Sequence, residues 1–375
     1  ADELQLTART KIEMERQIQS SANLFYRNKD ETETLPSTYN GLGYKNLIKI
    51  ELKLIDFKNI LKKNNTTSIP IVYIEEPEAH MHPQMQQRFI EYIEDFCKKL
   101  ETKNIQIIIT SHSSHIVNST DFSKVRYIKK YHDYIDVRNL IYFCNDENVE
   151  EDVKIFLKKY LTLNKCDLFF CDKAILIEGT AERLLLPDMI QKLTENGVLS
   201  DDIPLSSQYY SLIEVGGAYA YKFIPLLKFL EIPSLIITDL DSISESRTKC
   251  LVSEGKNTSN ATIKNWFSSI LKKKVNNLND IMSLTDAEKT YGNLHIEYQT
   301  TENGLCGRSL EESIKNANRN LFGLGDSPDE EKLEYDSSKD GSKTDFAMNL
   351  LFDEEKKNYV VPKYIEKGLV WLNDK

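Results

Sequence analysis

Two short apolar segments in the second half of the chain are each followed directly by carboxylates. Glu178 comes after the first segment, and Glu182 lies four residues further on. Asp239 and Asp241 come after the second. Mg²⁺ binds carboxylate oxygens and shares the rest of its shell with water and substrate phosphate. Two such ions about 4 Å apart stabilise both the attacking and the leaving oxygen of a phosphoryl displacement. The spacing therefore predicts a magnesium site.

The geometry of Asp239 and Asp241 depends on what the chain does after the strand. Their side chains point the same way if the strand continues, and they diverge onto two metals if the chain turns. Alternatively, acidic residues after a strand simply cap the next helix. Asp-x-Asp alone does not separate these interpretations, but the earlier Glu178-Gly179 pair favours the metal site.

The elements that must position these residues are short buried strands. Three apolar segments alternate with stretches of helical periodicity, namely residues 174–177, 209–215 and 233–238. This alternation predicts βαβ units with a parallel sheet, hence an α/β fold. Functional side chains gather at the carboxyl ends of such strands. The segments end in Glu178, in Gly216-Gly217 and in Asp239, so we expect these residues to meet at one edge of the sheet.

The order Glu-Gly, Gly-Gly, Asp-x-Asp resembles the Toprim domain of topoisomerases, primases and related nucleases. Its details resemble the overcoming-lysogenisation-defect (OLD) family of ATP-dependent nucleases. Val215-Gly216-Gly217 matches the second motif of that family, and residues 308–312 and 341–347 match two later motifs. The resemblance implies a two-metal nuclease site using Mg²⁺ or Mn²⁺. The metal ligands that it implies are Glu178, Glu182, Asp239, Asp241, Ser309 and Glu311.

The same resemblance implies catalytic roles for Glu178, Asp239, Asp241 and Lys343. A lysine beside the metals offsets phosphate charge, or protonates the leaving group if its pKa is depressed. Lys343 opposes the helix dipole in a first turn, so helix stability does not explain its position. Glu311 also has a purely structural explanation, because the dipole stabilises acidic residues in a first turn.

The first half of the chain carries a second group of polar residues after predicted strands. Strands are predicted at residues 69–74 and 105–110, with a helix between them at 83–100. The first strand leads into Glu75-Glu76 and the second into Ser111-His112. This resembles the second half of an ABC-type ATPase head. The resemblance implies that Glu75 holds Mg²⁺, Glu76 is the general base for the attacking water, and His112 senses the γ-phosphate.

A turn at Gly41 and Gly43 precedes a helix predicted over residues 44–63. Backbone N–H groups at such a helix start can bind an anion, although an ordinary helix start explains the same pattern. By resemblance, Gly41 and Gly43 form the signature turn that closes on ATP held by another protomer, which implies a homodimer or higher homo-oligomer.

The Walker A pattern G-x-x-x-x-G-K-[ST], which cradles the nucleotide phosphates, does not occur in the 375 residues. We therefore expect the ATPase head to bind ATP only with a Walker A segment supplied separately.

Composition sets the wider limits. The length suits about two domains, which we place at residues 1–165 for the partial ATPase head and 166–375 for the Toprim domain with a helical insertion. No apolar run approaches about 18 residues, so we expect a cytoplasmic protein without a membrane partner.

The six cysteines lack C-x-x-C spacing, which favours reduced thiols. Zinc binding by the histidines near His112 is disfavoured because their spacing is not that of zinc ligands.

The net charge of −10 argues against a uniformly basic DNA-binding surface, although Lys272–Lys274 is a local basic run. The combined prediction is a metal-dependent DNA endonuclease coupled to an ABC-type head. The resemblance adds anti-phage defence and a helicase or reverse-transcriptase partner. Two alternatives stay open: a non-catalytic ATPase-like scaffold of a nucleic-acid complex, and a Toprim enzyme that joins strands.

Overall fold

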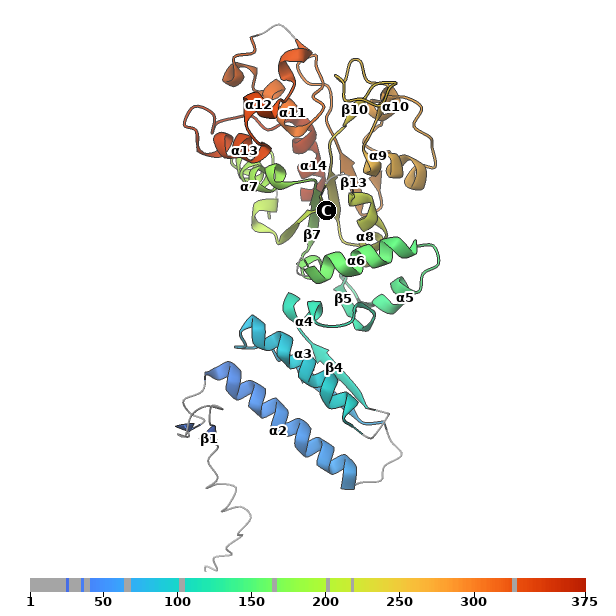
Figure 1. Cartoon of the computed structure of the whole chain (residues 1–375), viewed down its shortest axis with the longest axis vertical. Helices are drawn as coiled ribbons and strands as arrows, with labels where there is room; N and C mark the ends of the chain where they lie inside the picture. Colours follow the sequence, from blue (N-terminus) through green and yellow to red (C-terminus); the bar gives the residue numbers. More distant parts are fainter. Residues whose placement is uncertain are drawn as a thin grey trace, which may run out of the picture. The chain divides into compact units, whose positions relative to one another are not determined.

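The structure, a computed structural model, describes residues 25–26, 35–36, 41–63, 69–100, 105–163, 167–199, 203–216, 219–325 and 329–375. It divides into two compact units, residues 1–120 and 121–375, coloured in chain order in Figure 1. Gly217 of the second predicted motif lies outside the described residues. The first 40 residues are described only as a short antiparallel pair, β1 (Phe25–Tyr26) with β2 (Leu35–Pro36).

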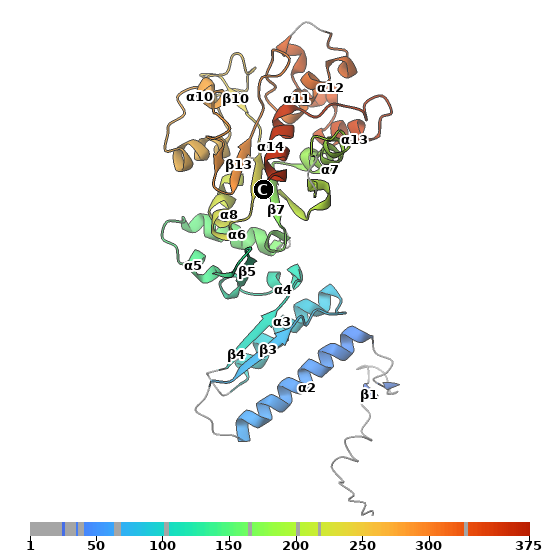
Figure 2. The ribbon, with the colours of Figure 1, turned by 180° about the vertical axis from the view of Figure 1, so that it is seen from behind.

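The first unit contains two parallel strands and the helices that accompany them. In chain order these are α2 (Leu42–Lys63), β3 (Ile71–Glu75), α3 (Pro83–Lys98), β4 (Gln106–Thr110) and α4 (Ser114–Asn118). Figure 2 shows α3 running along the strand pair. The core contains Leu54 of α2, Ile74 of β3 and four apolar side chains of α3. These elements confirm the predicted helices and strands to within two residues.

Gly43 is required by close packing in this unit, whereas Gly41 is not. A Cβ at Gly43 would lie 2.3 Å from the carbonyl oxygen of His80, while a Cβ at Gly41 would meet nothing within 4 Å. We therefore expect Gly43→Ala to destabilise the first unit by about 1–3 kcal/mol through overpacking, and Gly41→Ala to change its stability little. Urea denaturation monitored by protease resistance of residues 41–120 measures both. If both variants unfold at the same urea concentration, Gly43 is not packed closely against His80.

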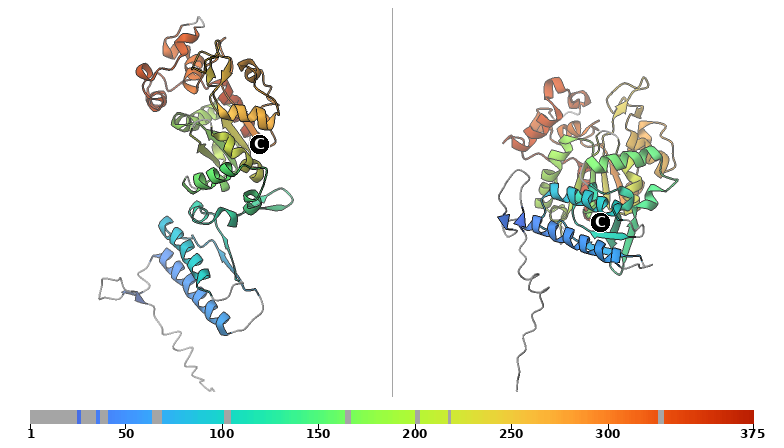
Figure 3. Two further views of the ribbon diagram at one scale, coloured as in Figure 1. Left: turned by 45° about the vertical axis from the view of Figure 1, so that its right-hand side comes forward. Right: turned by 60° about the horizontal axis from the view of Figure 1, so that its bottom comes forward.

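The second unit begins with an antiparallel hairpin, β5 (Arg126–Lys130) and β6 (Ile135–Asn139). Arg138 of this hairpin lies 2.9 Å from a carboxylate oxygen of Glu231 and donates to the carbonyl of Phe229. Both partners lie at the end of α8 (Ile224–Leu230). Figures 1 and 3 draw β5 close to α6 (Glu151–Leu163). The hairpin and α6 thus pack with the second unit; the domain boundary at residue 165 stays a prediction.

A five-stranded sheet forms the centre of the second unit. Its order is β12-β13-β9-β7-β8. The strands are β7 (Lys173–Ile177), β8 (Tyr210–Glu214), β9 (Ser234–Ile237), β12 (Thr290–Tyr291) and β13 (Leu294–Glu297). All are parallel except β12 at one edge. The inner strand β7, between β9 and β8, is buried at every position, as expected for a parallel strand covered on both faces. The predicted α/β class with a parallel sheet is confirmed.

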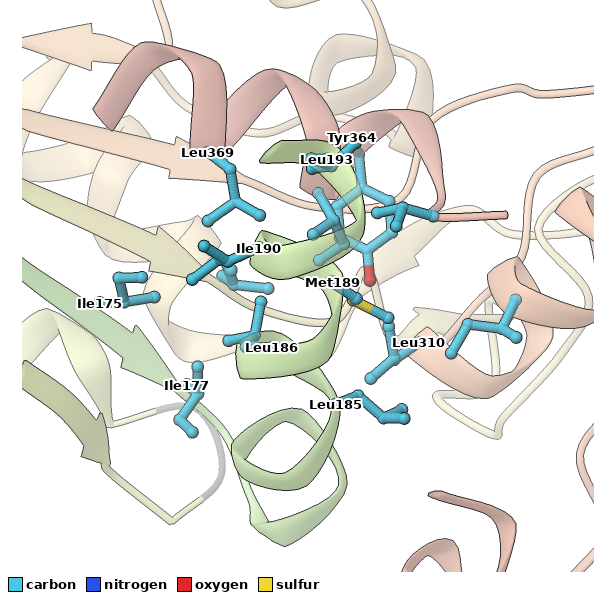
Figure 4. Close-up of a cluster of buried hydrophobic side chains, with 14 of the residues drawn as sticks. Ile175, Ile177, Leu185, Leu186, Met189, Ile190, Leu193, Leu310, Tyr364 and Leu369 are labelled. Carbon is cyan, nitrogen blue, oxygen red and sulfur yellow. The ribbon is translucent and has the colours of Figure 1, made fainter. Parts of the chain in front are cut away.

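Helix α7 (Thr180–Glu195) connects the sheet to the C-terminal helices. It packs on α13 (Lys343–Phe352), and α14 (Lys363–Asn373) packs on β9 and β13. Figure 4 shows Leu186 and Ile190 of α7 directed toward Ile175 and Ile177 of β7. A large apolar core, which includes Leu310 of α11 (Leu310–Ala317), joins these elements. This packing brings the starts of α7, α11 and α13 into one unit with the carboxyl ends of the strands.

The predicted helical insertion is present but is not one helix. Helix α9 (Ala261–Asn265) continues as a π-helical turn to Ile270, and α10 (Leu278–Met282) begins after a loop. Residues 271–277 between these helices are not helical. Lys272 has a left-handed backbone (φ 53°), and Asn277 starts α10 with a capping box. Lys273 in the basic run pairs with Glu288 at 2.6 Å, so this lysine is engaged within the protein.

Among the described residues, no helix has both the length and the hydropathy needed to cross a lipid bilayer. Five of the six cysteines fall in the described part, and none of these five forms a disulfide bond.

Candidate functional site

The carboxyl ends of β7 and β9 bring two of the predicted ligands together. Because these strands are adjacent and parallel, Glu178 after β7 reaches the backbone N–H of Asp239, which donates to Glu178 Oε1 at 3.0 Å. The hydroxyl of Thr238 donates to the same oxygen. Glu178 is thereby fixed beside Asp239.

Asp239 is buried and is held from two further sides. Its Oδ1 accepts from the backbone N–H of Leu310 at 3.0 Å and from Nε2 of Gln299 at 2.7 Å. Leu310 is the first residue of α11, so the start of that helix faces Asp239.

Helix α11 also contributes Glu311, which is fully buried. Ser309 Oγ donates to Glu311 Oε2 at 2.7 Å. Glu311 Oε1 has no hydrogen-bond partner within the described part of the chain, and the nearest cation is Lys343 Nζ at 3.1 Å. The neighbouring Glu312 points elsewhere, since it accepts from the backbone N–H groups of Arg308 and Tyr335.

Glu182 completes a group of four carboxylates that influence one another. It is buried in the first turn of α7. Burial, together with the negative charges of Glu311 and Glu178, raises the pKa of Glu182 to about 7, although its own backbone N–H and Lys343 act in the opposite direction. Burial, followed by repulsion from Glu178, raises the pKa of Asp239 well above its usual value. We call Glu178, Glu182, Asp239 and Glu311 the acidic cluster.

Lys343, the first residue of α13, is the cation of this cluster. Its Nζ lies 3.1 Å from Glu311 and 3.7 Å from Asp239 Oδ2, while about half of its side chain stays exposed. Burial alone would lower the pKa of Lys343, but Asp239, Glu311 and Glu182 outweigh it and raise that pKa. The lysine is therefore charged at neutral pH, which favours charge compensation over proton donation to a leaving group.

The acidic cluster fits the chemistry of a hard divalent cation. Four carboxylates share a mostly buried space with one ammonium group, and burial of like charges is costly without compensation. Within the described ranges, no three His, Cys, Asp or Glu side chains converge tightly enough to form a ready metal cage. The ammonium of Lys343 lies 3.1 Å from Glu311 and 3.7 Å from Asp239, so it neighbours two of the carboxylates that would hold the cation.

Asp241 forms its ion pair with a residue outside the acidic cluster. The chain turns after Asp239, and Asp241 adopts a left-handed backbone (φ 48°). Its Oδ1 pairs with Arg308 Nη2 at 3.0 Å. Burial raises the pKa of Asp241, while Arg308 acts most strongly in the opposite direction. The chain therefore turns after Asp239 and does not continue as a strand, and Arg308 holds the carboxylate of Asp241.

The first unit brings part of the predicted ATPase residues together. Glu75 ends β3 opposite Thr110 of β4. His112 Nε2 lies 3.3 Å from Glu76 Oε1, and Glu76 has a left-handed backbone (φ 42°). Gly43 packs against His80, in the loop that follows Glu76.

Several polar residues that hold these side chains were not predicted from the sequence. Glu78 accepts from Ser111 Oγ at 2.9 Å and from the backbone N–H of His112 at 2.7 Å, so it fixes the turn that carries His112. Asn260, Gln299 and Arg308 contact the acidic residues of the second unit. Of these three, only Arg308 lies within a motif that resembles the OLD family, because an isolated Asn or Gln has no distinctive sequence signal.

Two sequence families match the chain. The AAA ATPase domain matches residues 3–117. The Toprim domain of overcoming-lysogenization-defect-protein-like proteins matches residues 169–241.

Curated relatives cover both regions. Endonuclease GajA of Bacillus cereus (strain HuB5-5) is 32% identical over 93% of this chain and 55% of that protein. The OLD nuclease of Thermus scotoductus (strain ATCC 700910 / SA-01) is 25% identical over 59% of this chain and 39% of that protein. The chain thus spans about half the length of the GajA relative that it matches. It is homologous to Endonuclease GajA and the OLD nuclease and combines an AAA ATPase domain with an OLD-like Toprim domain.

Proposed function

We propose that this chain is the nuclease-bearing part of a Mg²⁺-dependent DNA endonuclease. The observation that carries the proposal is the acidic cluster with Lys343 at the carboxyl ends of β7 and β9. The names of the relatives, an endonuclease and a nuclease, support a nucleic-acid phosphodiester as the substrate, and DNA is the nucleic acid that we propose.

Each side chain of the site has a role that follows from its position. Glu178, Glu182, Asp239 and Glu311 hold the metal, with Ser309 orienting Glu311. When bound, Mg²⁺ polarises the phosphate and lowers the pKa of the attacking water. Lys343 balances the charge that develops on the phosphate and departing oxygen. Asp241 is the remaining proposed ligand, at present paired with Arg308.

We further propose that the first unit regulates DNA cleavage. Glu75, Glu76 and His112 act on ATP once a Walker A segment is supplied, and Gly41 and Gly43 form the signature turn against another protomer. Pairing of such heads makes a homodimer or higher homo-oligomer. We also propose that the protein acts in anti-phage defence together with a helicase or reverse-transcriptase partner.

Incubation with supercoiled plasmid tests the nuclease. We expect nicked or linear DNA with Mg²⁺ or Mn²⁺ and none with excess EDTA, because the clustered carboxylates cannot bind phosphate without a cation. Assays with and without ATP, on the chain alone and on a longer protein carrying a Walker A segment, separate nuclease activity from its regulation. No cleavage under any of these conditions would contradict the proposal and favour the scaffold interpretation.

A further inference from the structure

Asn260, just before the helical insertion, contacts two parts of the acidic cluster. It is almost completely buried. Its Nδ2 lies 2.9 Å from Glu178 Oε1, 2.8 Å from Thr238 Oγ1 and 2.9 Å from the carbonyl oxygen of Asp239. Two amide hydrogens are thus shared among three acceptors. The other end of the same amide caps α9, because Oδ1 accepts from the backbone N–H groups of Thr262 and Ile263.

Gln299, beyond the end of β13, makes a complementary set of contacts. It is fully buried. Its Nε2 donates to Asp239 Oδ1 at 2.7 Å and to Tyr364 Oη at 3.3 Å, while its Oε1 accepts from the backbone N–H of Leu240 at 2.6 Å. The amide therefore holds both the side chain of Asp239 and the backbone immediately after it.

We propose that Asn260 and Gln299 form an amide clamp that positions Glu178 and Asp239 for the metal, an inference that rests on the proposed function. Neutral amides donate hydrogen bonds without cancelling carboxylate charge, so the full negative charge stays available to a cation. The clamp contacts Glu178 Oε1 and Asp239 Oδ1, whereas Asp239 Oδ2 faces Lys343. Both are positioning residues, and partners of this kind orient metal ligands.

The clamp also links the insertion to the site. Asn260 satisfies two N–H groups at the start of α9 with the same side chain that binds Glu178. The cap of α9 and the orientation of Glu178 therefore depend on one residue, and an ordered insertion favours an ordered metal site.

Asn260→Ser tests the clamp. Serine can still cap α9 but lacks the amide group that bridges Glu178 and Asp239. Asn277→Ser is the matched control, because Asn277 caps the equally short α10 in the same insertion, where its side chain accepts from Asp280 N. The measurement is Mn²⁺ affinity by calorimetry without DNA, on proteins shown to be folded by circular dichroism. We expect the dissociation constant to rise about 10- to 100-fold for Asn260→Ser and to stay near wild type for Asn277→Ser.

The outcomes separate this inference from the nuclease proposal. Equal Mn²⁺ affinities of the two variants would overturn the clamp. Tight Mn²⁺ binding by the wild type without DNA cleavage would overturn the nuclease and leave the clamp standing if Asn260→Ser still weakens binding. A wild type that binds no Mn²⁺ would overturn both. Asn260→Thr, which also retains a capping oxygen, replaces the serine variant if that variant does not fold.

Discussion

Asp239→Asn is expected to reduce metal-dependent DNA cleavage by about 10³-fold or more while leaving the fold intact. Asparagine has the same shape, and its side-chain oxygen can still accept from Leu310 N and Gln299 Nε2. The substitution removes the negative charge at the centre of the acidic cluster. Metal stabilisation of transition-state charge is worth several kcal/mol, and each 1.36 kcal/mol corresponds to about a tenfold change in rate.

Although Asp239→Asn should lower cleavage, it should not lower the stability of the metal-free protein. Asp239 is buried beside Glu178, and both burial and that repulsion oppose its ionised form. We therefore expect the metal-free variant to unfold at the same temperature as the wild type or at a higher one. A variant that loses cleavage because it is misfolded would instead unfold earlier.

Glu312→Gln is the matched control for Asp239→Asn. Glu312 is also a buried carboxylate, and its contacts are with backbone N–H groups of Arg308 and Tyr335. Initial rates of supercoiled plasmid loss should stay within a few-fold of wild type for Glu312→Gln. An Asp239→Asn protein that cleaves as fast as this control would remove Asp239 from the site.

Lys343→Met is expected to lower cleavage by about 10²–10³-fold, the usual cost of removing one group that stabilises transition-state charge. It should also destabilise the metal-free protein, because Glu311 Oε1 is buried and its nearest cation is the lysine. Since Lys343 is half exposed, solvent screens much of this interaction, and we expect a loss of about 1 kcal/mol, or about 2–4 °C in unfolding temperature.

Metal should compensate this loss of stability. With the ammonium removed, Mn²⁺ enters the cluster without displacing a cation, so the Mn²⁺-induced rise in unfolding temperature should be larger in Lys343→Met than in the wild type. Lys339→Met is the control, because Lys339 is an exposed lysine 3.8 Å from Asp336. If the two variants agree in both unfolding temperature and cleavage rate, Lys343 has no role in charge balance.

Local sequence patterns determined the parallel sheet and the elements that carry the site. The apolar run before Glu178 is short and is followed by a stretch of helical periodicity, which favours a buried strand, and parallel strands align their carboxyl ends. Glu178 and Asp239 could therefore be placed together from the sequence. Lys343 entered the predicted site through resemblance, and in the structure it forms ion pairs with Asp239 and Glu311.

Tertiary packing decided which polar groups face one another. Asp241 pairs with Arg308, 67 residues away in the chain, and nothing local distinguishes that contact from a metal-binding position. The resemblance pointed to Glu311 rather than Glu312, and the docking of α11 gives the physical reason, because adjacent residues on a helix point in different directions. Asn260 and Gln299 acquire their roles because β9, β13 and α9 meet there. Sequence periodicity specifies which face of an element is buried, but the partners of a buried polar group depend on packing between distant segments.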